Sequence, residues 1–134
     1  MVNIGAFTLA PSVLIVNGMQ DIEEWEKSAR AVFAMQRSVY WWIGDMVAFG
    51  EARFGDDFYQ AVPEGVSLDL LTRCATVSRE FPPGERNMNV SWSHHQALVG
   101  WAPELKRTLL AKAESGNMSN ADFREYLSRI KGNR

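Results

Sequence analysis

The chain has 134 residues, of which 46% are hydrophobic and five are tryptophan. This length and composition predict one folded domain with a sizeable core and exclude a disordered chain. A single cysteine, Cys74, excludes an internal disulfide, and no secretory leader is apparent, so the expected compartment is the cytoplasm. The apolar runs are too short to span a bilayer, so no membrane partner is expected.

The net charge of −2 opposes nucleic-acid binding only if the charge is spread evenly. It is not: residues 1–65 carry nine acidic and four basic residues, a charge of −5, and residues 66–134 carry seven acidic and ten basic residues, a charge of +3. A basic half is typical of a nucleic-acid-binding protein whose binding surface is confined to one end. Ordinary variation in a small domain explains the same split, so charge alone leaves both interpretations open.

Residues 1–20 contain two short apolar segments, 6–10 and 13–16, separated by a Pro-Ser pair. The β-branched residues of the second segment predict a short extended arm or hairpin. Two strands are only marginally stable alone, so we expect the arm to pack on its own domain. An exposed strand edge would offer a route to dimerisation.

Residues 21–65 predict an acidic helical platform. Asp21 is a good N-cap, and apolar residues then recur every three or four positions as far as Phe54. Such a length predicts two helices, or one helix with a kink near residues 37–38 or at Gly44. The aromatic cluster at residues 40–42 is expected to belong to the core.

Residues 66–134 contain signals for four more helices. Ser67 caps a helix over residues 68–81, and Ser91 or Ser93 caps the next one. Proline at position 103 begins a third helix, and a Gly-Asn pair separates it from the last. Together with a short helix over 58–62, the pattern predicts an all-α domain over 21–134 that contains a helix-turn-helix, preceded by the arm over 1–20.

The segment from residue 68 to residue 130 resembles the DNA-binding part of the ParB/KorB partition-protein family. The resemblance lies in a recognition-type helix, a proline break, and the stretches VSWSHHQALVG and APELKRTLLAKAESGNMSNADFREYLSRI. The upstream stretch WWIGDMVAFGEARFG resembles small plasmid- and phage-borne bacterial proteins that carry the same tail. The nucleotide-binding and C-terminal dimerisation domains of the partition proteins have no counterpart here, so no CTP-driven clamp is expected.

The resemblance implies sequence-specific binding of double-stranded DNA by a transcriptional regulator or partition-like factor of a phage or plasmid, in the bacterial cytoplasm or nucleoid. The helix over residues 68–81 would enter the major groove, and the helix start at residues 91–95 would contact phosphates. An arginine–guanine contact is worth about 1–3 kcal/mol of base discrimination. The candidate DNA-binding residues are Ser67, Asp69, Thr72, Arg73, Thr76, Arg79, Ser91, Ser93, His94 and His95.

No pattern in the sequence predicts a metal, a cofactor or catalysis. Adjacent histidines point about 100° apart on a helix, so His94 and His95 do not form a shared zinc site, and one of them is expected to face phosphate or solvent. Cys74 with one of these histidines would be a nucleophile–base pair only if the thiol were accessible, and it falls on the expected buried face. An enzyme is therefore not expected.

Two function classes remain open. A DNA-binding protein of this kind is expected to act as a homodimer, because one helix reads too few base pairs for specificity. The alternative is an antitoxin- or inhibitor-like protein-binding module that docks a partner through its acidic, tryptophan-rich N-terminal half. An exposed Trp41 or Trp42 would favour that alternative.

Overall fold

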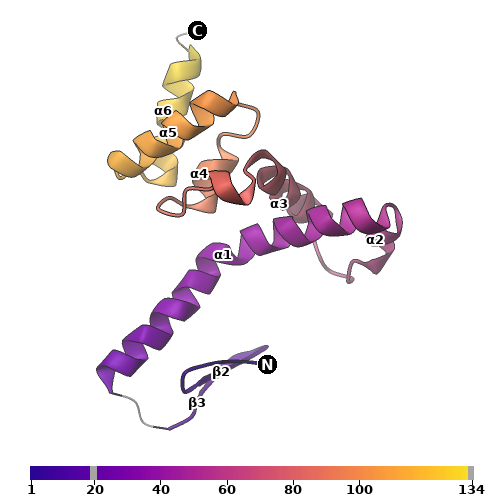
Figure 1. Cartoon of the computed structure of the whole chain (residues 1–134), viewed down its shortest axis with the longest axis vertical. Coiled ribbons are helices and arrows are strands. Elements are labelled where there is room, and N and C mark those ends of the chain that lie inside the picture. Colours follow the sequence, from indigo (N-terminus) through magenta and orange to yellow (C-terminus); the bar gives the residue numbers. More distant parts are fainter. Residues whose placement is uncertain (19–20, 133–134) are drawn as a thin grey trace. The chain divides into compact units, whose positions relative to one another are not determined.

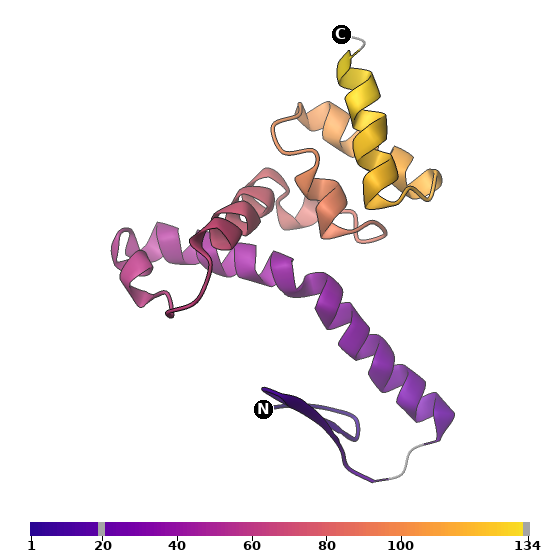
Figure 2. The ribbon, with the colours of Figure 1, turned by 180° about the vertical axis from the view of Figure 1, so that it is seen from behind.

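The computed structural model describes residues 1–18 and 21–132. The chain divides into two units, residues 1–39 and residues 40–134, and each is described by itself. Helix α1, Ile22–Phe54, runs from the first unit into the second. Figure 1 shows the ribbon coloured along the sequence, and Figure 2 shows it from behind.

The first unit begins with a three-stranded antiparallel sheet in the order β1 (Val2–Ile4), β2 (Phe7–Ala10), β3 (Val13–Val16). Strands β2 and β3 are the predicted hairpin; residues 19–20 of the expected arm lie outside the described residues. Strand β1 was not predicted, because three residues before a glycine turn are too few to show an alternating pattern. The fold is therefore mostly helical with a small sheet, and the all-α class is wrong in this respect.

Strand β3 forms one edge of this sheet, and all four of its residues, Val13, Leu14, Ile15 and Val16, are exposed apolar side chains. Successive side chains of a strand point to opposite faces, so both faces of β3 carry apolar groups. An edge strand of this kind has unpaired backbone groups as well as apolar surface.

Helix α1 begins as the sequence predicts. The Asp21 carboxylate accepts a hydrogen bond from the Glu24 amide at 2.8 Å, which satisfies one of the free donors of the first turn. The helix then continues without interruption to Phe54, so of the two expected arrangements, two helices or one kinked helix, the chain forms a single helix. Ser38, at the expected break, donates its hydroxyl to the Ala34 carbonyl at 2.8 Å and stays within the helix.

Gly44 does not end the helix, because it has a packing role instead. It lies where α3 (Leu68–Glu80) crosses α1, and a Cβ at this position would overlap the Cys74 carbonyl and the Ser78 hydroxyl. Only glycine allows the two backbones to approach so closely. The residue that a propensity scale marks as a helix breaker is therefore the contact point between two helices.

The aromatic cluster of α1 is only partly a core element. Trp41 is buried, but Tyr40 and Trp42 are 43% and 51% exposed, so the expectation is wrong for two of the three residues. Met46 and Phe49 follow Trp42 at helical spacing and are 62% and 65% exposed. We call Trp42, Met46 and Phe49 the outer stripe of α1.

Beyond α1, the expected short helix and the expected longer helix are both present. Helix α2, Asp57–Ala61, has no buried residue, and Asp56 at its start makes no side-chain cap. Helix α3 is capped by Ser67 as predicted and ends at Glu80, before the proline break. A single turn of 3₁₀ helix, Pro83–Glu85, follows within that break.

Helices α4 (Trp92–Gln96), α5 (Pro103–Ser115) and α6 (Asn120–Gly132) complete the second unit. Helix α4 ends at Gln96, and residues 97–100 form turns. On α6, Phe123 and Leu127 are buried and Ile130 is half-buried. The main core of this unit contains Trp41, Cys74, Val77, Phe81, Trp92, Leu98, Trp101, Leu109, Leu110, Ala113, Phe123 and Leu127. Among the described residues, no helix combines the length and the apolar character that a membrane span needs.

The close contact at Gly44 makes a testable prediction about stability. Alanine is the better helix former by about 1 kcal/mol, but a methyl group here must push α3 away, at an overpacking cost of about 1–3 kcal/mol. We expect Gly44→Ala to lower the free energy of unfolding in urea titrations. Gly84→Ala is the control, since nothing lies within 4 Å of a Cβ there. A Gly44→Ala variant as stable as the wild type would contradict this account of the contact.

Candidate nucleic-acid interface

The candidate reading surface is the outer face of α3. Leu71, Cys74 and Val77 face the interior, which leaves the other side of the helix to solvent. The outward residues are those that the sequence singles out: Asp69, Thr72, Arg73, Thr76 and Arg79. The structure therefore places five of the predicted contact residues on one helix face, with Ser67 at its start.

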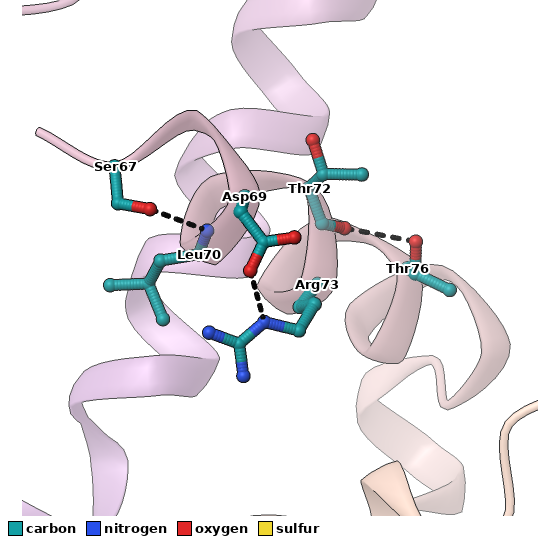
Figure 3. Close-up of polar contacts among 6 residues, drawn as sticks. All are labelled: Ser67, Asp69, Leu70, Thr72, Arg73 and Thr76. Carbon is teal, nitrogen blue, oxygen red and sulfur yellow. Dashed lines mark hydrogen bonds and ion pairs between the residues drawn. The ribbon is translucent and has the colours of Figure 1, made fainter.

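Two hydroxyls of this face are already used by the helix itself (Figure 3). The Ser67 hydroxyl accepts the Leu70 amide at 3.2 Å, and the Thr76 hydroxyl donates to the Thr72 carbonyl at 2.9 Å. Both bonds replace interactions with water and hold the side chains against the helix backbone. Of this group, Thr72 and the charged residues project furthest into solvent.

Both arginines of the α3 face are paired with carboxylates. Arg73 Nε donates to Asp69 Oδ2 at 3.1 Å, one helical turn away (Figure 3), and Arg79 forms an ion pair with Glu51 of α1. Each arginine is about half exposed, so these are surface pairs of modest strength. A phosphate that approached this face would have to replace a carboxylate at each arginine.

The arginine that orders the second unit is Arg86, which the sequence did not single out. Its guanidinium is almost buried, and it binds both carboxylate oxygens of Asp45 at 2.7 and 3.0 Å. Its Nε donates to the Phe81 carbonyl at 2.7 Å, and its charge lies 4.3 Å from the centre of the Trp41 ring. The hydrogen bonds from Arg86 hold the pKa of Asp45 below its ordinary value. Arg86 therefore joins α1 to the end of α3. No local pattern in the sequence identifies two partners that are 41 positions apart.

His94 is part of the capping of α4 and is buried. The Ser91 hydroxyl accepts the His94 amide at 3.2 Å, and His94 Nδ1 accepts the Ser91 amide at 3.1 Å. The proton of the neutral ring therefore lies on Nε2, which donates to the Met118 carbonyl at 2.9 Å. Ser91 also donates to the Asn120 side-chain oxygen at 2.8 Å, so these groups tie α4 to the start of α6.

His95 is fully buried and is bonded at both nitrogens. Its Nε2 accepts the Asn87 amide at 3.0 Å, which places the proton on Nδ1, and Nδ1 donates to the Ser91 carbonyl at 2.8 Å. The ring also meets Trp41 and Phe81 edge to face, with centroids 4.8 and 5.0 Å apart. Burial lowers the pKa of His95 to about 4.

The expectation that one histidine faces phosphate or solvent is therefore wrong. Both rings lie in the interior and link backbone groups of different loops, and the amide of residue 94 is already bonded to Ser91. Of the predicted helix-start group, Ser93 is half-buried and Ser91 is engaged on both sides. From the sequence, a histidine pair at a helix start is expected to lie on a polar surface, because no neighbouring residue indicates that two loops close over it.

The described residues offer no metal or nucleophile site. They contain no group of three or more histidine, cysteine or acidic side chains that a metal ion would need. Cys74 is fully buried, as the sequence predicts, and burial raises the pKa of its thiol. A buried, protonated thiol is a poor nucleophile.

Comparison with known proteins gives a limited result. The chain matches no protein-family model and no solved structure. It is similar to the transcriptional regulator NovE of Streptomyces niveus, with 27% identity over 107 residues. The match covers 79% of this chain and 49% of NovE, so the chain spans about half the length of this relative. The similarity is to a regulator of transcription; the resemblance to partition proteins stays a prediction.

The buried His95 predicts a pH-dependent stability. An unfolded histidine has a pKa of about 6.5, so between pH 6.5 and about 4 the unfolded chain binds the proton that the folded chain excludes. Stability is therefore full above pH 6.5 and falls as the pH drops towards 4, by up to about 1.4 kcal/mol per pH unit. We expect urea titrations between pH 4.5 and 7.5 to show this slope, and His95→Gln to reduce it. An equal slope in the variant would assign the effect to other groups.

Proposed function

We propose that this protein is a DNA-binding transcriptional regulator that recognises duplex DNA. The observation that carries the proposal is the similarity to NovE over most of this chain. Two features of the molecule support it: the predominance of basic residues in residues 66–134, and the exposed polar face of α3.

The α3 face is proposed to contact the sugar–phosphate backbone. Thr72, Arg73 and Arg79 are exposed, and both arginines have carboxylate partners that DNA would displace. Exchange of a surface carboxylate for a phosphate costs little, because surface ion pairs are worth about 0–1 kcal/mol. Asp69 then orders the Arg73 side chain in the free protein and does not face DNA itself.

The salt dependence of DNA binding tests this function. Phosphate contacts by Arg73 and Arg79 predict a loss of affinity of roughly tenfold between 50 and 200 mM salt, because each contact releases condensed counterions. We expect fluorescence anisotropy to show this loss with fragments that flank the gene, and one fragment to resist excess competitor DNA. Arg73→Ala should weaken binding several-fold and reduce the slope by about 0.9. A protein that retains no fragment at low salt is not a DNA-binding regulator.

We further propose that the regulator is a homodimer joined through strand β3. A second copy of β3 fits this edge in two ways: its backbone supplies the missing hydrogen-bond partners, and its side chains at 13–16 are apolar on both faces. Each copy contacts only a short stretch of DNA. A dimer presents two DNA-contacting surfaces and so reads enough base pairs for specificity.

The mass in solution tests the dimer. We expect light scattering after gel filtration to give twice the monomer mass of 15.1 kDa, and Ile15→Lys to give the monomer, because a charge on an edge strand blocks pairing. Val2→Lys is the matched control, since Val2 is exposed on the opposite edge strand, β1. A wild-type monomer, or a dimer that Val2→Lys alone disrupts, contradicts pairing through β3.

A second candidate function is a protein-binding module that uses α1. It is favoured by the half-exposed Trp42 and the rest of the outer stripe. It ranks second because the similarity to NovE favours a regulator, and because the Asp45 carboxylate of this segment is held by the nearly buried Arg86. Two results together would favour this candidate. The protein would retain no DNA fragment at any salt concentration, and it would capture a protein partner that the Trp42→Ala variant does not capture.

A further inference from the structure

Helices α5 and α6 have the dimensions of a helix-turn-helix. Each has 13 residues, and only residues 116–119 separate them. The turn contains Gly116 at the end of α5 and Asn117 with a left-handed φ of 47°, and Ser119 then accepts the Asp122 amide at 3.1 Å. Figures 1 and 2 both show α6 crossing α5. A Gly-containing turn of this length between two crossing helices is the usual arrangement in DNA-binding proteins.

The earlier helix pair is a poorer match. Helix α2 has five residues, none of them buried, and residues 62–67 separate it from α3. Of the residues of α2, the partly buried Phe58 packs against the small core cluster that contains Leu71 and Ala75 of α3, so α2 gives α3 less support than a buried helix would. The order of elements along the chain, which favoured α3 in the sequence, therefore does not identify the reading helix.

The orientation of α6 is fixed by its inner side. Phe123 and Leu127 are buried in the main core, and α4 is bonded to the start of α6 through Ser91–Asn120 and to the preceding turn through His94–Met118. His94, whose ring also packs against Phe123, thus belongs to the support of α6. This support leaves one side of the helix pointing away from the domain.

One exposed row of α6, on the flank of its buried side, carries no carboxylate. Ala121, Arg124, Ser128 and Lys131 recur at spacings of three and four and are all exposed. Among the described residues, Arg124 has no hydrogen-bond or ion-pair partner, and Lys131 lies over the Trp101 ring at 5.2 Å without an acidic partner. The acidic residues fall on the neighbouring row, where Glu125 binds Arg129 at 2.6 Å.

Helix α5 adds two more cations of this kind. Arg107 and Lys112 are exposed, and neither has a carboxylate partner in the described part of the chain. On α3, by contrast, both arginines are paired. The unpaired positive charge of the second unit is therefore concentrated on α5 and α6, where a polyanion binds without displacing a carboxylate.

We propose that α6 is the helix that enters the major groove, with Arg124 and Ser128 at the base edges and Lys131 at the backbone. This assignment rests on the proposed function. Arginine pairs with guanine through two hydrogen bonds, serine bonds to any base, and the small Ala121 allows the helix to approach the groove floor. The arginines of α3 then contact the flanking backbone.

The test compares three substitutions in the full chain, with the fragment that the wild type retains and with competitor DNA. Arg124→Gln removes the proposed base contact, and Arg129→Gln is its matched control on the neighbouring row of the same helix. Arg73→Gln tests α3. Circular dichroism melting verifies that each variant is folded. We expect Arg124→Gln to lose about tenfold or more in affinity for the retained fragment but little for competitor, so that specificity falls. Arg129→Gln should stay within about twofold, and Arg73→Gln should weaken both DNAs alike with a smaller salt slope.

Three results would overturn the assignment. If Arg124→Gln binds like the wild type while Arg73→Gln loses specificity, α3 is the reading helix. If Arg124→Gln weakens the fragment and the competitor equally and lowers the salt slope, Arg124 is a phosphate contact and α6 does not read bases. If the wild type retains no fragment at low salt, the proposed function fails, and the assignment of α6 fails with it.

Discussion

The second unit depends on a single buried guanidinium. Arg86 binds Asp45, the Phe81 carbonyl and the face of the Trp41 ring at once. A buried charge is costly unless it is paired. Here each of the three guanidinium nitrogens donates a hydrogen bond to an oxygen of Asp45 or Phe81. The main-chain segment that follows Arg86 supplies the amide that binds His95, so the arginine and the histidine position one loop together. Without Arg86, α1 and α3 would keep their apolar contacts and the more exposed Arg79–Glu51 ion pair.

The distribution of charge matters more here than its sum. A net charge of −2 would repel DNA from an evenly charged protein, yet carboxylates pair with the arginines of α3, while Arg107 of α5 and Arg124 of α6 have no carboxylate partner among the described residues. At physiological salt, charges interact over about 8 Å, so a phosphate responds to the local set. The acidic first half and the basic second half therefore have separate effects.

Local signals in the sequence predicted much of the fold. Capping by Asp21, Ser67 and Ser91 and the proline start of α5 were all correct, because each depends on residues three or four positions apart. The errors concern contacts between distant segments. Gly44 looked like a helix break because Cys74 and Ser78 of α3 are 30 or more positions away, and the histidines looked exposed because Met118 and Asn87 cover them.

The candidate site shows the same division. Its residues could be assigned to a helix face from periodicity, and the α3 face is where the sequence placed it. Which cation is free for a ligand depends on ion pairs such as Arg79–Glu51, which joins residues 28 positions apart. No spacing rule contains that information. The partition-family resemblance supplied a recognition helix but no way to weigh α3 against α6.

The separations in sequence also imply an order of assembly. The contacts that position α6 lie between residues 91 and 127, so they close short loops and form early at small entropic cost. The bond between Arg86 and Asp45 closes a loop of 41 residues, so the docking of α1 is expected late. Until then Trp41 is exposed as well, beside the outer stripe that stays exposed in the folded protein. The slow step of folding is therefore the one during which the chain is most prone to aggregate.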